Sequence, residues 1–410
     1  MGWPRQLSPA GTRITFGDLC ATLFASIFLP NQYRKLRNEV SSHFGARHVY
    51  LTGSGRGALT VILTSLANED KRREVIIPAY TCFSVPSAVK AAGYKVRLVD
   101  LDRNGYDYDL AKLEQAIGPT TRAILLVYPF GLGCNIEAVQ NLARSKGVLL
   151  IEDVAQSMGL QCRGKCAGMH GDFGFFSLSK GKAITSIRGG IIITNDDAHA
   201  ALLGKTVEAL PSPGILANLK LMIEVKVIWL FLRPTLFWLI GALPFIRLGE
   251  THYDPTMRPT QMHRTAAVLC RRMLARLDQT NRERAAAARN ILSQLQTSEA
   301  TMPMTGISPE HSTFLRLPIL CSNEELRDHL FATLQKCGAS RMYNSTLAVI
   351  QDRELFAGSQ PDESSYPNAV RVARCLVTLP THAYVTSRDR SEIVQALKST
   401  QSAVGSRTNG

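Results

Sequence analysis

Residues 45 to 195 alternate short apolar runs with amphipathic stretches, and this alternation narrows the folds open to the chain. The apolar runs are rich in Val, Ile and Leu and show little polar alternation, as strands buried on both faces do. Six runs predict strands: Glu74 to Ile77, Lys95 to Asp100, Ala123 to Val127, Val148 to Glu152, Gly174 to Ser177 and Gly190 to Thr194. Helical patterns between them cover Gly57 to Ala67, Ser84 to Ala92, Asp109 to Ile117 and Ile136 to Lys146. These repeated strand–helix–strand units predict an α/β fold whose mostly parallel sheet carries helices on both sides.

A long apolar segment then breaks the pattern. The stretch from Val227 to Ile246 holds Arg233 as its one charge. Its length approaches the ~20 residues of a spanning helix, but Arg233 and Pro234 near its middle would be unfavourable there. We therefore predict that residues 215–248 form two short helices that meet at Pro234 and lie on a membrane surface. The alternative is burial in a subunit interface or against the small domain. Basic residues for the lipid headgroups are Lys220, Lys226 and Arg247.

Beyond this segment, apolar residues follow helical spacing again from Met262 onward. From about Thr313 the chain predicts a compact α+β unit, with a strand at Phe314 to Leu320 and a helix at Asn323 to Cys337. The last ten residues are small and polar, which predicts disorder. The expected division is a large domain at 12–210, a hydrophobic insertion at 211–250, a linking helix with a smaller α+β C-terminal domain at 251–400, and a disordered tail at 401–410.

The charge balance is strongly basic, with 47 Lys and Arg against 33 Asp and Glu, a formal net charge of +14. The basic residues are scattered, with no run longer than Lys71-Arg72-Arg73 and no aromatic residues between them, so a nucleic-acid partner is not expected. Anionic phosphate ligands or anionic lipids are equally compatible with this excess. The 410 residues, 45% of them hydrophobic, can bury a sizeable core.

Nine cysteines, an odd number, have no regular spacing, and residues 1–11 lack the apolar core of a secretory signal. We therefore expect free thiols in a cytoplasmic compartment, with peripheral attachment to the inner face of the membrane if the insertion binds lipid. Cys162 and Cys166 lie four residues apart, but no matching His or Cys pair completes a zinc site. We expect two half-buried thiols in a hairpin there and no metal ligands.

Two motifs place ligand-binding groups where strands meet helices. The turn from Ser54 to Leu59, SGRGAL, opens a helix with small residues, and its backbone N–H groups can hold an anion. A simple tight turn is the commoner explanation of such a motif. The run from Ile151 to Ser157, IEDVAQS, puts acidic residues at the end of an apolar strand, where open α/β sheets bind ligands. A protonated pyridine nitrogen would pair with Asp153 there, although a helix N-cap explains the acidic residues equally well.

A third motif runs from Phe176 to Lys182, FSLSKGK, and is followed by a turn at Gly189-Gly190. A hydroxyl and two lysines follow an apolar strand here. A lysine in an apolar cleft or near a cation loses proton affinity and becomes a nucleophilic amine. The alternative is a solvated loop with surface lysines.

Together the three motifs offer a phosphate cradle, a carboxylate for a pyridinium and an amine for an aldehyde, which is the set that pyridoxal phosphate (PLP) needs. Their order and spacing resemble the DegT/DnrJ-type family of PLP-dependent sugar aminotransferases, from about Leu36 to Ala396. The resemblance implies the PLP-transferase fold type I. The motifs that carry it are Pro78-Ala79-Tyr80-Thr81-Cys82 followed by Val96 to Asp102, Tyr128-Pro129-Phe130-Gly131, Glu152-Asp153-x-Ala155-Gln156 and Leu379-Pro380-Thr381-His382.

The resemblance implies a role for each matching residue. Lys182 would form the Schiff base with PLP and then move the proton, and Asp153 would hold the pyridine nitrogen protonated. Lys180 is the competing amine, but the five-residue offset from Ser177 favours Lys182. The remaining cofactor contacts would come from the backbone of Arg56 and Gly57, the hydroxyl of Ser177, and Gln156 near the ring oxygen.

Three features depart from the family pattern. Cys82 stands where the family has an aromatic residue stacked on the cofactor ring, so Phe83 or Tyr80 would stack instead. The family's Asn and Arg before Met262, which reach the neighbouring subunit's phosphate, are replaced, leaving Arg258 as a substitute. The insertion is not ordinary for the family.

The resulting hypothesis is a homodimeric PLP-dependent aminotransferase that converts a keto sugar, linked to a nucleotide, into an amino sugar with an amino acid donor such as glutamate. One alternative is a PLP enzyme acting on a lipid-linked or other carbonyl substrate at a membrane. The other is a catalytically silent scaffold, and the presence of Asp153, Ser177 and Lys182 together argues against it.

Overall fold

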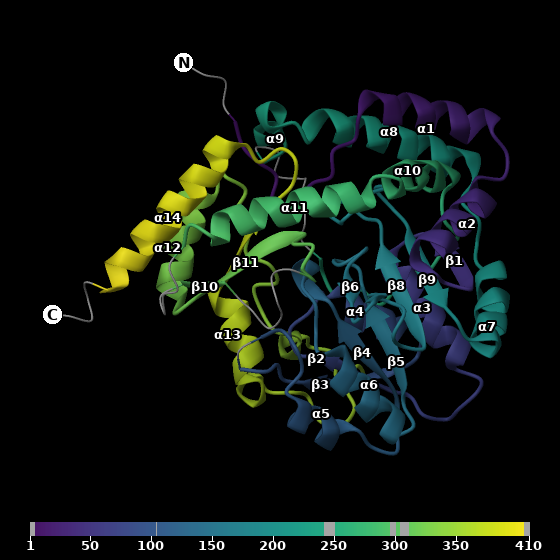
Figure 1. The fold of residues 1–410 in the computed structure, drawn as a ribbon. Coiled ribbons are helices and arrows are strands. Elements are labelled where there is room, and N and C mark those ends of the chain that lie inside the picture. Colours follow the sequence, from purple (N-terminus) through teal and green to yellow (C-terminus); the bar gives the residue numbers. More distant parts are fainter. Residues whose placement is uncertain (1–4, 104, 242–250, 296–300, 304–310, 406–410) are drawn as a thin grey trace.

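A seven-stranded sheet forms the centre of the large domain (Figure 1). The computed structural model describes residues 5–103, 105–241, 251–295, 301–303 and 311–405. The strand order is β1-β9-β8-β5-β4-β2-β3; β9 is antiparallel to both neighbours, and the pairs from β8 to β3 are parallel. The predicted α/β fold with a mostly parallel sheet is confirmed. The strands are β1 (His48–Thr52), β2 (Glu74–Pro78), β3 (Lys95–Val99), β4 (Thr121–Val127), β5 (Leu149–Asp153), β8 (Phe173–Ser177) and β9 (Gly190–Thr194).

Strand β1 is the member of this sheet that the apolar pattern does not predict. It lies at the sheet edge, and its side chains alternate between half-buried and buried over His48, Val49 and Tyr50. The other six strands begin and end within two residues of the predicted runs. Their side chains are almost entirely buried because helices cover both faces of the sheet.

The side chains of each strand divide between two hydrophobic clusters, one on each face. Ile77 and Leu125 belong to one cluster, whereas their neighbours Ile76 and Leu126 belong to the other. The first cluster takes side chains from α3 (Gly55–Leu66), α4 (Ser84–Ala91) and α7 (Asp197–Glu208), among other helices. The second takes side chains from α2 (Gln32–Phe44), α5 (Leu110–Ala116) and α6 (Ile136–Ser145), among others.

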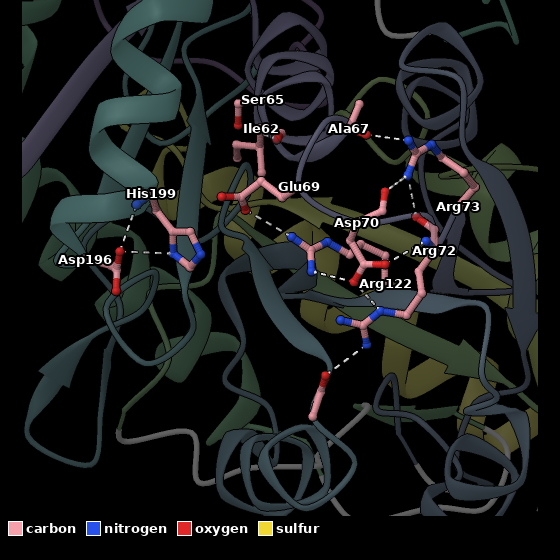
Figure 2. Close-up of polar contacts among 11 residues, drawn as sticks. Ile62, Ser65, Ala67, Glu69, Asp70, Arg72, Arg73, Arg122, Asp196 and His199 are labelled. Atoms are coloured by element: carbon pink, nitrogen blue, oxygen red, sulfur yellow. Dashed lines mark hydrogen bonds and ion pairs between the residues drawn. The ribbon is translucent and has the colours of Figure 1, made fainter.

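A cluster of charged residues closes the end of the sheet at which β2 and β4 begin (Figure 2). Arg72 and Arg122 both point at Asp70, whose Oδ2 accepts from Arg72 Nε at 2.6 Å and from Arg122 Nη1 at 3.1 Å. Arg122 also donates to Glu69 at 3.2 Å. These contacts hold the turn between α3 and β2, at the end of the sheet away from the site described below.

A short hairpin carries the two closely spaced cysteines. It consists of β6 (Gln161–Cys162) and β7 (Lys165–Cys166), which pair antiparallel. Cys162 is half-buried and Cys166 is buried, and all nine cysteines are free thiols. The predicted hairpin is confirmed, with one thiol more deeply buried than expected.

The insertion contains two helices, α8 (Ile215–Phe231) and α9 (Pro234–Gly241), and α8 lies alongside α1 (Phe16–Phe28) (Figure 1). The predicted break at Pro234 is confirmed because α9 begins at that residue. Helix α8 is continuous over 17 residues and so joins the amphipathic stretch to the apolar one. The rest of the predicted insertion, residues 242–250 with Arg247 among them, lies outside the described residues. No helix in the described part of the chain is long and apolar enough to cross a membrane.

Two helices, α10 (Arg264–Leu274) and α11 (Leu277–Leu292), lead to a small domain built on an antiparallel three-stranded sheet. Its predicted strand and helix are confirmed as β11 (Arg316–Cys321) and α12 (Glu324–Leu334). Residues 401–405 of the predicted disordered tail belong instead to the last helix, and residues 406–410 lie outside the described residues. The other elements are β10 (Thr301–Pro303), α13 (Pro367–Cys375), β12 (Leu376–Pro380) and α14 (Ser387–Gly405).

Candidate active site

A cavity of roughly 340 Å³ opens at the carboxyl ends of β4, β5 and β8. Open α/β sheets bind ligands at this edge. The start of α3 forms part of the wall, and the small domain contributes Arg316 and Tyr343. Gly57, one of the residues predicted to bind the phosphate, is not part of the wall. The predicted residues that the cavity brings together are Arg56, Cys82, Asp153, Gln156, Ser177 and Lys182.

The start of α3 is capped by its own chain. Ser54 Oγ accepts from the Gly57 N–H at 2.9 Å, so that N–H is occupied, contrary to the prediction that it faces a phosphate. Helix geometry leaves the N–H groups of Gly55 and Arg56 without an intrahelical acceptor. A side chain at Gly55 would place its Cβ 2.6 Å from the Cβ of Ser177. The glycine therefore allows the helix start to approach the hydroxyl at the end of β8.

Two adjacent carboxylates at the end of β5 have opposite environments. Glu152 is fully buried and accepts four hydrogen bonds, from the Tyr128 hydroxyl and from the N–H groups of Gly168, His170 and Gly171. It holds the segment after β7 in place. Asp153 accepts one hydrogen bond, from the Ala155 N–H at 2.9 Å, and lines the cavity. Burial raises the pKa of Asp153 to about 6, and the Ala155 N–H and Lys182 oppose the shift. Of the pair, Asp153 is the carboxylate available to a ligand.

Lys182 lies in the loop between β8 and β9 and reaches into the cavity. Its ammonium makes no hydrogen bond or ion pair with any residue in the described part of the chain. Burial lowers the pKa of Lys182, and Arg316 lowers it further, against the opposing charges of Cys82 and Asp153. Lys180 also lines the cavity, but its side chain is exposed. The structure thus offers Lys182 as the amine with the reduced proton affinity.

The lysine loop is anchored from outside the sheet. Thr12 Oγ1 donates to the Lys182 carbonyl at 2.8 Å, and Arg284 Nη1 donates to the Ala183 carbonyl at 2.8 Å. The same N-terminal segment contacts the small domain, where the Leu7 N–H donates to the Lys336 carbonyl at 2.9 Å. The segment therefore connects the small domain to the backbone that carries Lys182.

Tyr343, Gln156 and Cys82 form a second side of the cavity. Gln156 Nε2 donates to the Tyr343 hydroxyl at 3.2 Å, and its Oε1 accepts from the Phe130 N–H at 3.1 Å. Burial raises the pKa of Tyr343 well above its usual value, so the phenol keeps its proton. Tyr343 is a site residue that the sequence motifs do not identify.

The expected stacking residues lie elsewhere. Tyr80 is buried in the core and donates its hydroxyl to the Met342 carbonyl, and Phe83 packs on the same core. Neither side chain lines the cavity, so the prediction that one of them replaces Cys82 as a stacking group is not supported. Cys82 itself lies 3.0 Å from Ser84 Oγ at the cavity wall.

Arg316, at the start of β11, is a further residue that the sequence does not single out. Its side chain is 9% exposed, and its one hydrogen bond in the described structure is a long contact of 3.5 Å to Thr378 Oγ1. Burial lowers the pKa of this guanidinium to about 10. No carboxylate of the described residues forms an ion pair with it. The buried guanidinium of Arg316 and the amine of Lys182 together form a site for an anionic ligand.

The segment before α10 runs past the mouth of the cavity. Thr251 and Met257 line the cavity, and Pro259 lies against Gly57. Arg258, the predicted substitute for the family's phosphate-binding residues, is exposed and is not part of the wall in its own chain.

These positions agree with the comparison of the chain with known families. The model of the DegT/DnrJ/EryC1/StrS aminotransferase family matches residues 27–398, nearly the whole chain. The chain belongs to this family. Its placement among the DegT-type proteins confirms the resemblance carried by the three motifs.

Two curated relatives of this DegT-type chain are 36% identical to it over part of their length. GDP-perosamine synthase of Caulobacter vibrioides matches over 161 residues, which are 39% of this chain and 43% of that protein. UDP-N-acetyl-3-dehydro-alpha-D-glucosamine 3-aminotransferase of Acidithiobacillus ferrooxidans matches over 173 residues, 42% of this chain and 47% of that protein. The matches thus span less than half the length of these relatives.

A solved structure shares the whole fold. The PLP form of the putative sugar aminotransferase Spr1654 of Streptococcus pneumoniae superposes with a TM-score of 0.74 at 18% identity. The alignment covers 97% of this DegT-type chain and 99% of that one. The predicted fold type is confirmed by this likeness.

Proposed function

We propose that this protein is a PLP-dependent aminotransferase that converts a keto sugar, linked to a nucleotide, into an amino sugar with an amino acid as donor. The observation that carries the proposal is the half-buried, unpaired amine of Lys182, which shares one cavity with the carboxylate of Asp153. An amine of lowered pKa is the group that attacks a carbonyl, and a buried carboxylate suits a cationic ring nitrogen.

The residues of the cavity fit PLP in three respects. The start of α3 and the Ser177 hydroxyl offer donors for the phosphate group, the close approach at Gly55 bringing them together. Asp153 offers its carboxylate to the ring nitrogen, and Lys182 offers its amine to the aldehyde. PLP, when bound, supplies the aldehyde and an electron-accepting ring, and the protein supplies binding and proton transfer.

The side chains that line the cavity have separate roles. Asp153 carries a negative charge above its pKa of about 6 and would hold a proton on a bound ring nitrogen. Lys182 would take up and return the substrate proton during transamination, for which its lowered pKa suits it. Gln156 is held between the Tyr343 hydroxyl and the Phe130 N–H, so its side-chain amide has a fixed orientation at the cavity wall. The small domain closes the cavity from the side of Arg316.

The substrates are proposed from the relatives and from charge. The names of the two curated relatives support a keto sugar attached to a nucleotide as the amino acceptor. The buried cation Arg316 supports an amino acid donor such as glutamate, because a carboxylate would neutralise it. A homodimer is proposed because the fold type builds its sites between two subunits, and the exposed Arg258 lies on the segment that lines the cavity mouth.

We also propose that the enzyme is cytoplasmic and touches the inner face of the membrane through the segment 215–248. The exposed side chains of Ile215, Leu216 and Ile223 support this contact. A lipid-linked carbonyl substrate remains the second candidate, since such a contact would bring the enzyme to it. The scaffold alternative does not account for a half-buried lysine in the cavity without a partner among the described residues.

The test is spectroscopic and then chemical. The purified protein should be yellow, should lose the colour on addition of glutamate, and should regain it with a nucleotide-linked keto sugar. Lys182→Ala should bind PLP without this cycle, and Lys180→Ala should behave as wild type. A colourless protein that takes up no PLP would refute the proposal. A protein that cycles only with lipid-linked carbonyl substrates would favour the second candidate.

A further inference from the structure

Helix α1 presents its apolar side to the outside and its polar side to the protein. The buried residues are Asp18, Thr22 and Ser26, which are spaced four apart on one face. On the opposite side Phe24 is 57% exposed and Phe28 is 65% exposed. A helix on the surface of a globular protein has the reverse arrangement, with its apolar stripe on the core. The orientation of α1 therefore needs a cause.

Ion pairs hold α1 in this orientation. Asp18 is 1% exposed and accepts from Arg272 Nε at 2.9 Å, near the end of α10, and from Arg276 Nη2 at 2.6 Å, in the turn between α10 and α11. The hydroxyls of Thr22 and Ser26 are buried without a hydrogen-bond partner in the described structure. Unpaired buried hydroxyls are unfavourable, so the polar stripe gains little beyond the ion pairs by facing inward. A contact on the outer side of α1 must therefore stabilise the apolar stripe in its outward orientation.

Helix α8 extends the same surface. It lies alongside α1 (Figure 1), and the rings of Phe16 and Trp229 approach to 6.1 Å between centroids. Sixteen large hydrophobic residues are exposed in the described structure, and twelve of them belong to α1, its C-terminal cap or α8. We call this surface the α1–α8 face. Its residues are Phe16, Leu23, Phe24, Ile27, Phe28, Leu29, Ile215, Leu216, Leu219, Ile223, Val227 and Leu230.

The charges on these two helices have one sign wherever they are exposed. The acidic residues are Asp18, which is buried, and Glu224, which is paired with Arg188 at 2.8 Å. The exposed charges on α8 are Lys220 and Lys226. An interface between two copies would bring these like charges together, whereas anionic lipid headgroups would neutralise them. Apolar side chains with a cationic rim fit an anionic bilayer surface.

We propose that the α1–α8 face lies on an anionic bilayer, with both helices in the plane of the interface and their apolar side chains among the acyl chains. This extends the membrane contact proposed above to α1, which precedes the large-domain sheet and lies far from the insertion in the sequence. The proposal rests on the membrane contact and not on the aminotransferase reaction, because no residue of the face lines the cavity.

The experiment is co-sedimentation of the full-length, PLP-loaded protein with vesicles. One set contains phosphatidylcholine alone and the other phosphatidylcholine with phosphatidylglycerol. The α1 variant is Phe24→Ser with Phe28→Ser, and the matched control is Leu110→Ser with Val349→Ser, which replaces two exposed apolar residues away from the face. We expect wild type and control to bind the anionic vesicles, and the α1 variant to bind at least about tenfold more weakly.

A second variant keeps the test sharp if the first folds poorly. Lys220→Glu with Lys226→Glu changes exposed charges alone and should also weaken binding, and added salt should weaken the binding of wild type. Wild-type protein that ignores both vesicle sets, or binds them through α8 with the α1 variant unaffected, would overturn the proposal. An oligomer that the α1 variant converts into a smaller species, without vesicle binding, would assign the face to a second copy. Colour cycling with donor, measured on the same samples, reports separately on the aminotransferase proposal.

Discussion

Replacing Asp153 with Asn should stabilise the cofactor-free protein while removing its activity. Burial raises the pKa of Asp153 from its usual 3.8 to about 6, and each pKa unit corresponds to about 1.4 kcal/mol. Carrying the charge in the folded state therefore costs about 3 kcal/mol once the pH is well above 6. An Asn side chain avoids this cost, and its Oδ1 can still accept the hydrogen bond from the Ala155 N–H.

The size of the effect should depend on pH in one direction. Below about pH 4 the carboxyl is protonated in both the folded and the unfolded chain, so the substitution should change stability little. Between about pH 4 and 6 the unfolded chain loses this proton first, and the wild type becomes less stable than the variant. Above this range the difference should hold its full value. The pKa of about 6 already includes the attraction of Lys182, so about 3 kcal/mol is the net cost of the charge.

The assay is urea unfolding of both cofactor-free proteins at one pH below this range and one above it. Asp109→Asn alters the half-buried carboxylate that caps α5 and controls for the loss of one charge, because Asn can keep the cap. If Asp153→Asn is no more stable than the wild type at the higher pH, the charge of Asp153 does not destabilise the folded protein and the reasoning is refuted. Added PLP should stabilise the wild type more than the variant, and transamination by the variant should fall by roughly two to three orders of magnitude.

Three further outcomes are expected. Borohydride reduction followed by peptide mapping should place the pyridoxyl group on Lys182, and an adduct on Lys180 would reverse that assignment. Arg316→Gln should raise the KM for the amino acid donor about ten- to a hundredfold, as expected for a lost charged hydrogen bond, while the KM for the keto sugar stays within twofold; equal changes in both would remove its proposed role. Glu152→Ala should lower the free energy of unfolding by at least about 3 kcal/mol in urea titrations, because it leaves four donors unpaired, and a loss below about 1 kcal/mol would show that those donors find other acceptors.

The central sheet is predictable because its strands are buried on both faces. Runs such as Gly190 to Thr194 contain no polar side chain that must reach water until their last residue, so composition alone marks them. Strand β1 escapes this criterion because it lies at the edge, where His48 and Tyr50 reach polar surroundings. The break of the insertion at Pro234 is predictable for a different reason, since the ring of proline cannot continue a helix ladder.

The sequence predicts only those site residues that lie at or just after the ends of strands in the large domain. Asp153 and Ser177 each end a strand, and Lys182 follows by a short loop, so local sequence places them together. Arg316 and Tyr343 come from the small domain, and their approach depends on packing between distant segments. The Gly57 N–H differs from the prediction for a local reason, because Ser54 is also a good helix cap and accepts its hydrogen bond.

The N-terminal segment has a mechanical consequence for the protein. It is bonded at Leu7 to the small domain and at Thr12 to the carbonyl of Lys182, with only four residues between the two points. A tether of nearly fixed length transmits displacement, so opening or closing of the small domain should pull on the reactive lysine as well as on the cavity wall. We expect Thr12→Val, which keeps the shape and removes the hydrogen bond to Lys182, to change the absorbance of the PLP-loaded protein. Identical spectra for the variant and the wild type would show that the lysine loop moves independently of the small domain.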